Sequence, residues 1–347
     1  MSEKTPYIQI NLDKIRENAE RIMSLCKGKG IDLWCVTKSF LADKRISEVL
    51  LKCGCKGLCD SRIQNLFRLR ENFPDAKLMS IRSPGFSFLE DLVKNVDVSL
   101  QTDISTINRI SEIAGKLNKK HSIILLVELG DLREGIPKDE FLSVVQSTLK
   151  LDGVDVVGIG TTLTCLSGAI PTTENLGELL EMNKRLKNEL AINLPIVAGG
   201  GSNVLPMLID GELPGEINEL HVGESIVLGT NVLTREFLPG LNADTFELVA
   251  EVIECYDKPS KPWGKFSQNA MGENPEFKDM GVRKRAILNV GKQDTIPTFL
   301  TPLDDGVVLI DASSDHMVVD VEDAGMIRTG CTLSLDLVLG AGPFDGQ

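Results

Sequence analysis

Long hydrophobic runs are absent from this 347-residue sequence. None approaches the roughly 18 apolar residues that a membrane-spanning helix needs, and the opening residues lack the apolar core of a signal peptide. Internal repeats of solenoid length and low-complexity tracts are absent as well. We therefore expect a cytoplasmic globular protein with no membrane partner.

Positive charge is scarce relative to negative charge. The chain has 37 Lys and Arg against 50 Asp and Glu, which gives a formal net charge of −13 at pH 7. Surfaces that bind nucleic acid or anionic membranes are basic, so this balance argues against both kinds of partner. It is compatible with a small cationic substrate.

Histidine is scarce too, with three residues in the chain. Eight cysteines are present, but they do not form the paired spacing of a zinc site, and no nearby histidines complete one. Most of the cysteines lie in apolar runs, where a reduced thiol packs as a small hydrophobic group. The sequence thus predicts no metal site and no disulfide framework.

A regular alternation of strand and helix patterns fills the first two thirds of the chain. The strand candidates are residues 33–38, 57–60, 77–81, 96–100, 122–129, 154–162, 195–199 and 219–228. Amphipathic helical stretches lie between them at residues 46–51, 63–71, 87–94, 104–117, 138–151 and 174–190. This alternation predicts an α/β fold, a (β/α)8 TIM barrel, whose active site lies at the carboxyl ends of the strands.

A second, all-β domain is expected after the barrel. Beyond residue 228 the helical signal fades, and short strands are expected at residues 246–256, 285–290, 307–311, 317–321 and 333–339. The alternating stretch near residues 7–11 precedes the barrel and can join this β structure. We expect the barrel at residues 12–235 and the C-terminal β domain at residues 236–347 together with the strand at 7–11.

Lys38 ends the first predicted barrel strand, which is an apolar run. Burial at such a strand end would favour the neutral amine that Schiff-base chemistry requires. The alternative is a surface lysine that merely follows a strand. The same lysine in a barrel also lies at the end where active sites form.

Other predicted strand ends carry residues that suit a phosphorylated ligand. The seventh strand runs into a series of glycines and then Ser202, and the eighth contains His221 and Gly223. Glycines let backbone amides approach an anion, and the loops after strands seven and eight are where barrels bind phosphate, although such glycines can also form a turn without a ligand. Arg133 after the fifth strand and Thr162 after the sixth add a fixed cation and a hydroxyl. Together with Lys38, these features fit pyridoxal 5′-phosphate lying across the barrel mouth.

Seven motifs occur in an order that resembles the alanine racemase family, the fold-type III pyridoxal-phosphate enzymes, and within it the ornithine racemase branch. In the barrel they are Val36-Thr37-Lys38, the run from Gly130 to Ile136, Gly200-Gly201-Ser202 and Gly223-Glu224. In the second domain they are the run from Gly281 to Ile287, Gly291-Lys292-Gln293-Asp294 and Ala312-Ser313-Ser314-Asp315-His316. The resemblance extends over nearly the whole chain, from Tyr7 to about Leu339.

The resemblance implies a homodimer with shared active sites, in which each site borrows residues from the partner's β domain. Lys38 would form the Schiff base, and Arg133 would face the cofactor and the substrate carboxylate. Ser314 and Asp315 would line the substrate pocket from the partner subunit. The phosphate would be held by hydroxyl and backbone amide groups of Gly201, Ser202, Gly223 and Glu224.

Departures from the alanine racemase pattern bear on the substrate. Those enzymes have a tyrosine as second base where this chain has Lys292, an arginine beside the pyridine nitrogen where it has His221, and a histidine near the ring where it has Thr162. The tyrosine that follows their Schiff-base lysine is also missing, since the chain has only Tyr7 and Tyr256. Ornithine or lysine therefore suits the site better than alanine, and Asp315, Asp294 and Glu134 are candidate partners for a distal ammonium.

The sequence thus predicts a pyridoxal-phosphate-dependent isomerase that interconverts the L and D forms of ornithine or lysine by removing the α-proton. Lys38 is the expected base on one face, and either Lys292 or His316 is the expected base on the other. The alternatives are an alanine racemase, an amino-acid decarboxylase of the same fold, and a non-enzymatic cofactor carrier. Decarboxylases usually are longer and carry a cysteine-aspartate pair that this chain lacks, and carriers resemble the barrel alone.

Overall fold

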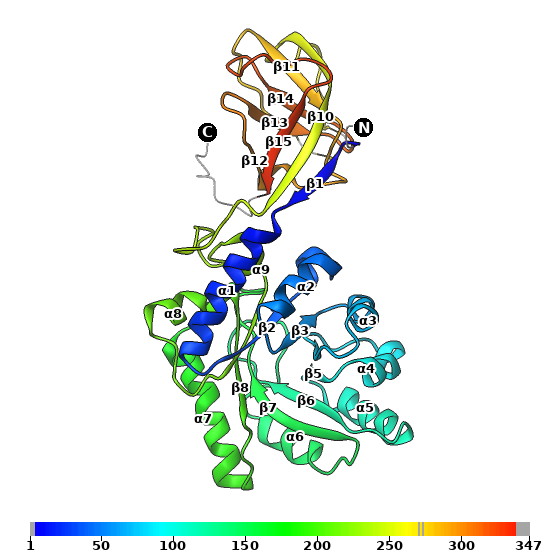
Figure 1. Ribbon diagram of the computed structural model, residues 1–347, viewed down its shortest axis with the longest axis vertical. Helices are drawn as coiled ribbons and strands as arrows, with labels where there is room; N and C mark the ends of the chain where they lie inside the picture. The colour runs from blue at the N-terminus through cyan, green and yellow to red at the C-terminus, as the bar shows by residue number, and fades with distance from the viewer. Residues whose placement is uncertain (1–3, 270, 273, 338–347) are drawn as a thin grey trace. The chain divides into compact units, whose positions relative to one another are not determined.

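The structure is a computed structural model that describes residues 4–269, 271–272 and 274–337. It contains two compact units, one formed by residues 12–242 and the other by residues 1–11 with 243–347. The first is a closed parallel β/α barrel and the second is an antiparallel β domain, as the sequence predicts (Figure 1). Within the described residues, no helix is both long enough and apolar enough to cross a bilayer.

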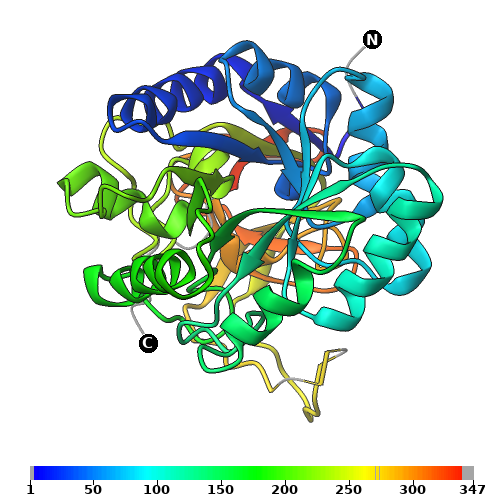
Figure 2. The same cartoon turned by 90° about the horizontal axis from the view of Figure 1, so that it is seen from below.

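Eight parallel strands close the barrel in chain order, β2-β3-β4-β5-β6-β7-β8-β9, with the helices on the outside (Figure 2). The strands are β2 (Asp32–Val36), β3 (Gly57–Asp60), β4 (Leu78–Ser80), β5 (Val98–Gln101), β6 (His121–Leu126), β7 (Val154–Gly160), β8 (Ile196–Gly201) and β9 (Glu219–Val222). Each predicted barrel strand is thus confirmed, with one long overshoot. The eighth ends at Val222 rather than at residue 228, because the apolar residues that follow belong to a helix.

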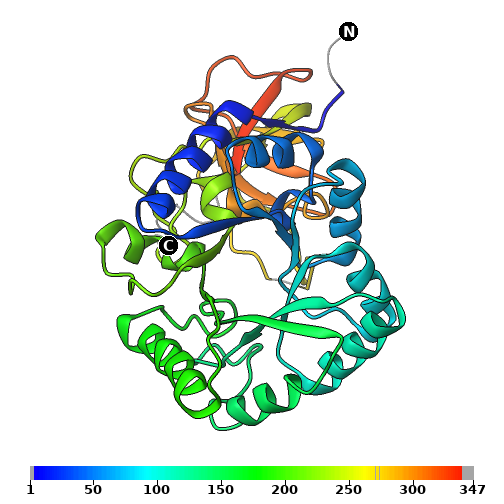
Figure 3. The same ribbon diagram turned by 60° about the horizontal axis from the view of Figure 1, so that its bottom comes forward.

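The helices that surround the barrel have the amphipathic spacing read from the sequence (Figure 3). They are α1 (Leu12–Gly28), α2 (Lys44–Lys52), α3 (Ile63–Asn72), α4 (Leu89–Asn95), α5 (Ile104–Lys116), α6 (Phe141–Thr148), α7 (Thr173–Leu190), α8 (Leu205–Asp210) and α9 (Glu224–Leu228). In α1, for example, Ile15, Ala19, Ile22 and Cys26 are buried at helical spacing. Short 3₁₀ turns, η1 (Lys38–Phe40), η2 (Phe86–Phe88) and η3 (Ser202–Val204), follow β2, β4 and β8.

The barrel interior is filled by side chains and is a packed core. Buried residues from five neighbouring strands pack there together: Trp34, Val36, Cys59, Met79, Leu100, Ile124 and Leu126. Gly57 must lack a side chain, because a Cβ at that position would lie 2.4 Å from the Trp34 ring. This packing leaves chemistry to the strand ends and to the few polar side chains that enter the interior.

The second unit is an antiparallel sheet with the order β12-β15-β10-β11-β14-β13, and β1 pairs with β10. Its strands are β1 (Tyr7–Ile10), β10 (Phe246–Pro259), β11 (Val282–Leu288), β12 (Leu300–Pro302), β13 (Val308–Ala312), β14 (Met317–Asp320) and β15 (Thr332–Leu337). The expected contribution of the N-terminal strand is confirmed, with Tyr7 opposite Val249. The last expected strand, residues 333–339, ends in two residues that lie outside the described part of the chain. β12 was not expected.

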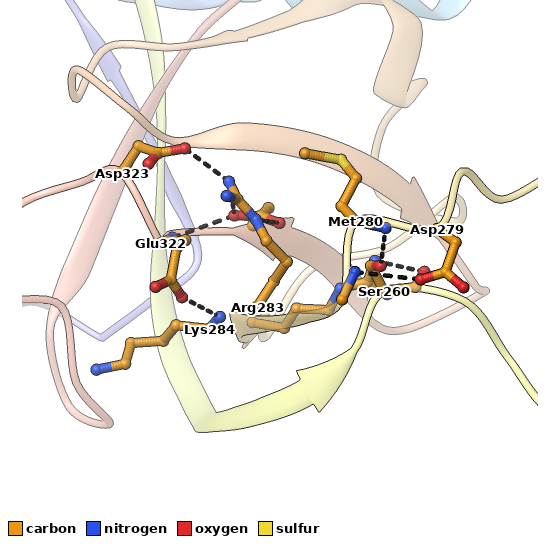
Figure 4. A network of polar contacts seen from close by, with 10 residues as sticks. Ser260, Asp279, Met280, Arg283, Lys284, Glu322 and Asp323 are labelled. Carbon is orange, nitrogen blue, oxygen red and sulfur yellow. Dashed lines mark hydrogen bonds and ion pairs between the residues drawn. The ribbon is translucent and has the colours of Figure 1, made fainter.

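A network of ion pairs and hydrogen bonds fastens β11 to the segment after β14 (Figure 4). The guanidinium of Arg283 donates to both carboxylate oxygens of Asp320, at 2.9 and 3.0 Å, and to Asp323 at 2.6 Å. The backbone N–H of Lys284 donates to Glu322 at 2.6 Å. The Gly281 to Ile287 motif therefore stabilises the β domain.

Candidate active site

Lys38 begins η1, two residues beyond the end of β2. Thr37 before it is fully buried, and its hydroxyl donates to Asp60 Oδ2 at 2.6 Å and to the Cys59 carbonyl at 3.3 Å. Lys38 itself is exposed. The expectation that strand burial removes water from this lysine is therefore wrong for the single chain, because the strand stops early and leaves Lys38 on the rim of the barrel mouth.

Asp60 is a buried carboxylate that the sequence analysis missed. It is the last residue of β3 and is fully buried. Besides the Thr37 hydroxyl, it accepts the Arg62 backbone N–H at 2.8 Å and the Asn65 side-chain amide at 3.1 and 3.2 Å. The bond to Thr37 fixes the backbone directly before Lys38. The signal in the sequence was a carboxylate directly at the carboxyl end of an apolar strand.

Arg133 lies in the loop after β6, where its guanidinium forms a two-pronged ion pair with its neighbour Glu134. This pairing with Glu134 raises the pKa of Arg133 further above its ordinary value, so the side chain is a permanent cation. The loop is anchored by Asp131, which is 1% exposed. Asp131 accepts the backbone N–H groups of Leu166 and Ser167 at 3.1 and 3.2 Å, which ties the β6 loop to the β7 loop.

The β7 loop places Thr162 and Cys165 at the mouth. Thr162 is half-buried and lies two residues beyond β7. Burial raises the pKa of the Cys165 thiol, while the charges of Arg133 and Lys38 act on it in the opposite direction. Because charges act strongly only at short range, this shared influence indicates that Lys38, Arg133 and Cys165 lie on the same side of the mouth.

The loops after β8 and β9 form a cradle of close backbone contacts. The Ser202 hydroxyl accepts the N–H groups of Gly223 at 3.4 Å and Ser225 at 3.3 Å. A Cβ on Gly201 would lie 2.5 Å from the His221 carbonyl, and one on Gly223 would lie 2.8 Å from Val36 Cβ. Gly201 is therefore required for the β8 loop to approach β9, and Gly223 is required for the β9 loop to approach β2. The Glu224 carboxylate pairs with Arg235 at 2.6 Å, which leaves its backbone N–H as the group that can face an anion.

His221 points from β9 toward a carboxylate in the barrel interior. Its Nε2 lies 3.1 Å from Glu219 Oε1, and Glu219 also pairs with Lys56 at 2.8 Å. Burial opposes the ionisation of Glu219, but His221 and Lys56 outweigh it and lower the pKa of Glu219 to about 2. His221 is predicted from the sequence, whereas its two supporting residues, Glu219 and Lys56, are not.

The candidates of the β domain converge on two adjoining turns. The Lys292 N–H donates to the Ser313 carbonyl at 2.8 Å, and the Gln293 N–H donates to the Ser314 carbonyl at 3.1 Å. Asp315 and His316 are exposed in the second of these turns. Lys292, Ser314, Asp315 and His316 are therefore brought together, as the barrel candidates are brought together at the carboxyl ends of their strands.

Lys292 has an anion beside it. Its Nζ lies 3.2 Å from Asp311 Oδ1, and its side chain is 21% exposed. Neighbouring cations favour the neutral amine that can act as a base, whereas a neighbouring carboxylate favours the charged form. The neighbour of Lys292 is thus the opposite of the one that a basic lysine needs.

The residues of the barrel mouth fit pyridoxal 5′-phosphate. Backbone N–H groups of Gly223 and Ser225 already converge on one oxygen atom, and a Cβ at Gly201 or Gly223 would collide with the His221 carbonyl or with Val36. A primary amine, a permanent cation and an imidazole lie on the strand ends of the same barrel. This is the donor set that an anionic aldehyde cofactor with a pyridine ring requires.

Comparisons with known proteins agree with this fit. A family model for the alanine racemase N-terminal domain matches residues 10–229. The chain is 40% identical to an ornithine racemase from Acetoanaerobium sticklandii over 92% of this chain and 90% of the relative. It is 38% identical to a lysine racemase from Thermotoga maritima over 94% of this chain and 91% of the relative.

More distant relatives and solved structures share the fold. An alanine racemase from Clostridium perfringens is 27% identical over 60% of this chain and 55% of the relative. The structure of an alanine racemase from Clostridium difficile 630 superposes with a TM-score of 0.75 at 17% identity, covering 98% of this chain and 89% of that one. A D-threonine aldolase from Filomicrobium marinum superposes at 0.73 with 15% identity, covering 96% of this chain and 86% of that one, so the fold alone does not fix the reaction.

The family match over most of the barrel and the two relatives that cover nearly the whole chain settle the question that the fold leaves open. The chain belongs to the alanine racemase family of pyridoxal 5′-phosphate-dependent amino-acid racemases.

Proposed function

We propose that this enzyme interconverts the L and D forms of a diamino acid, ornithine or lysine, in the cytoplasm. The support from the comparisons is that the relatives named for these two substrates match nearly the whole chain, whereas the alanine racemase matches 60% of it. The eight cysteines, all free thiols, suit a reducing compartment.

The observation that carries the choice of substrate is the environment of Asp315. Its carboxylate accepts hydrogen bonds from the Gln293 amide and from the Ser314 hydroxyl, which are both neutral donors. In the described part of the chain it has no cationic partner. A carboxylate held in place but left without a countercharge suits the distal ammonium of ornithine or lysine.

The other two candidate carboxylates are already engaged. Asp294 accepts the backbone N–H of Gly291 at 3.0 Å, within its own turn. Glu134 is paired with Arg133. Glu134 therefore already has a countercharge, whereas Asp294, like Asp315, accepts from a neutral donor; Asp315, which is held by two side-chain donors, is the first of these two carboxylates to test.

We assign the racemisation to groups on opposite faces of the substrate. Pyridoxal phosphate, when bound, spreads the charge that develops at the α-carbon. Lys38 Nζ holds the cofactor and then removes or returns the α-proton on one face. Arg133 binds the substrate carboxylate, and Thr162 and His221 lie beside the cofactor ring. Gly201, Ser202, Gly223 and Glu224 hold its phosphate.

The second base is Lys292 or His316, both in the adjoining turns of the β domain. The ion pair between Lys292 and Asp311 favours the charged form of the lysine, which supports His316 as the better base. We propose that these turns, with Ser314 and Asp315, come from the partner subunit of a homodimer, so that each active site is shared between two chains.

The reaction is tested by incubating the protein and pyridoxal phosphate with L-ornithine, L-lysine or L-alanine in deuterated water. A diamino-acid racemase incorporates α-deuterium and loses optical rotation with ornithine or lysine, and works poorly on alanine. Release of carbon dioxide would identify a decarboxylase, and an unchanged substrate would identify a cofactor carrier. Either outcome would overturn the proposal.

The second base is tested by comparing Lys292→Ala with His316→Ala. Loss of the base on one face blocks racemisation. One enantiomer still exchanges its α-proton for solvent deuterium, because Lys38 still acts on its own face. We expect this one-sided exchange in one of the two variants. Normal racemisation by both would show that the assignment of the second base is wrong.

A further inference from the structure

A line of charged side chains runs from His221 on β9 along the amino ends of strands β9, β2 and β3. Glu219 is the central member, and its side chain is 1% exposed. One of its oxygens lies 3.1 Å from His221 Nε2 and the other lies 2.8 Å from Lys56 Nζ. Lys56 also pairs with Asp32 at 2.8 Å. The line therefore connects a half-buried imidazole with an exposed carboxylate through two partly or fully buried charges.

Strand geometry explains why these groups share the interior. Glu219 and His221 are two residues apart on β9 and so project to the same side. The register with β2 pairs Asp32 with Glu219 and Trp34 with His221, and Trp34 is a member of the interior core. The Lys56 ammonium lies 5.9 Å from the centre of the Trp34 ring, where the ring face attracts a cation. The line is therefore built into the barrel.

Burying a charged carboxylate costs free energy unless cations and hydrogen-bond donors surround it. Glu219 is ionised at neutral pH, and an ionised carboxylate only accepts hydrogen bonds, so the His221 Nε2 beside it must carry a hydrogen. The other ring nitrogen, Nδ1, is then the one whose protonation can change. The negative charge of Glu219 favours a proton on it, and the positive charge of Lys56 weakens that effect.

We propose that Glu219 is a positioning residue that, balanced by Lys56, sets the protonation of His221 and so the hydrogen bond that His221 offers to the pyridine nitrogen of the cofactor. The part that concerns the cofactor rests on the proposed function, in which His221 lies beside the ring. The coupling among Glu219, Lys56 and His221 does not rest on the proposed function, because all three side chains are present in the protein without the cofactor.

Few other titratable groups lie on the strands near His221. Strand β8, which flanks β9 on the other side, has no titratable side chain in its sequence, Ile196–Gly201. Strand β3 contributes the Cys59 thiol, which stays neutral because burial raises its pKa well above the ordinary value, and the Asp60 carboxylate, which is bonded to Thr37 and Asn65 at the carboxyl end of the strand. Glu219 and Lys56, with the more distant Asp32, are therefore the charges to change.

The coupling can be measured in the cofactor-free protein by NMR of the histidine side chains. The chain has three histidines, so the ring signals can be assigned by single substitutions. Glu219→Gln keeps the shape and removes the negative charge beside the ring, so the midpoint of the His221 titration should move to lower pH. Lys56→Met removes the opposing cation and should move the same midpoint to higher pH.

Opposite shifts distinguish an electrostatic line from mere damage to the barrel, which would move both variants in the same direction. Asp97→Asn is the matched control, because it changes a carboxylate near His121, beside strands β5 and β6, which do not adjoin β9. It should leave the His221 midpoint in place. Midpoints that stay unchanged in Glu219→Gln, or that move the same way in both test variants, would overturn the proposal.

The effect on the cofactor is measured in the protein loaded with pyridoxal phosphate. The visible absorption band, or its dependence on pH, should change in Glu219→Gln and remain as in the parent protein in Asp97→Asn. A shifted His221 titration with an unchanged band would overturn the role toward the cofactor while leaving the coupling intact. Failure of the parent protein to bind the cofactor at all would instead count against the proposed function.

Discussion

At the carboxyl end of the barrel strands, buried carboxylates form hydrogen bonds that fix the loops carrying reactive side chains. At the amino end, the buried polar side chains form hydrogen bonds with one another instead. Asp60 fixes the backbone before Lys38, and Asp131 ties the Arg133 loop to the next loop. At the amino end, His121 is 3% exposed and bonds to the Ser99 hydroxyl at 2.9 Å.

A polar cavity lies at the amino end of the barrel strands. Its volume is about 300 Å³, and its lining includes Arg70, Asp97, Lys119 and His121. Arg70 is committed to Asp97 at 2.7 Å and to the carbonyls of the loop before β4. A cavity with charged walls is therefore a weaker indicator of an active site than a loop whose backbone is fixed next to a reactive side chain.

Substituting one lysine at each end should give the largest contrast. Lys38→Ala removes the amine that holds the cofactor and moves the proton, so we expect racemase activity to fall about a thousandfold or more. Lys119→Ala at the amino end should leave activity within about twofold, since exposed surface groups contribute little. Racemisation assays on both purified variants check this, and comparable losses would erase the distinction between the two ends.

The cradle should be the next most sensitive feature. Gly201→Ala would place a Cβ 2.5 Å from the His221 carbonyl and push the β8 and β9 loops apart. We expect the affinity for pyridoxal phosphate to fall by a factor of about 10 to 100, equivalent to about 1.4 to 2.8 kcal/mol. Gly215→Ala is the control, because its Cβ would meet nothing within 4 Å. Fluorescence or absorbance titration with the cofactor measures both, and equal affinities would contradict a steric requirement at the cradle.

At the amino end, His121 should make the free energy of unfolding depend on pH. Burial lowers the pKa of His121 to about 4, so the folded protein keeps this ring neutral while the unfolded chain takes up a proton below about pH 6.5. Stability from this residue is therefore present above pH 6.5 and is lost as the pH falls toward 4. Between pH 7.5 and pH 5 the loss should be about 2 kcal/mol.

Denaturant unfolding at the two pH values measures this loss, and His121→Gln should reduce it. An equal dependence on pH in the variant would show that other groups cause it.

The smallest effect is expected where one loop holds another. Asp131→Asn keeps the shape but weakens the acceptors for the Leu166 and Ser167 N–H groups, at a cost of about 1 to 2 kcal/mol. We expect faster hydrogen exchange across residues 164–168 and a rise in KM of a few fold. Ser167→Ala, which removes a single donor to Asp131, should give a smaller change of the same sign. Exchange rates that remain at the parent values in Asp131→Asn would show that this carboxylate does not hold the loop.

Much of the fold could be predicted because its signals are local. Each barrel strand is a short apolar run with a turn after it, and α1 repeats its apolar residues at helical spacing. The eighth strand was extended too far because Ile226, Val227 and Leu228 are apolar in either a strand or a helix, and Gly223 is what separates the two elements. β12 was missed because it is three residues long and contains Pro302.

The supporting residues of the site could not be predicted, because their contacts are distant in the sequence. Lys56 and Glu219 are 163 positions apart, and Asp131 is 35 positions from Leu166. An isolated acidic residue in a sequence is most often exposed, so only the folded chain distinguishes Glu219 and Asp131 from the rest. Gly201 and Ser202 are adjacent in the chain and Gly223 lies in the next predicted strand, so these residues of the cradle could be predicted from the sequence.

The account depends most on the covalent link between Lys38 and pyridoxal phosphate. Borohydride reduction of the cofactor-loaded protein, followed by digestion and mass spectrometry, tests it directly. We predict that the phosphopyridoxyl group is found on Lys38 alone, with Lys119 unmodified as an internal reference. A label on another lysine, or no label on a protein that has bound the cofactor, would contradict the account.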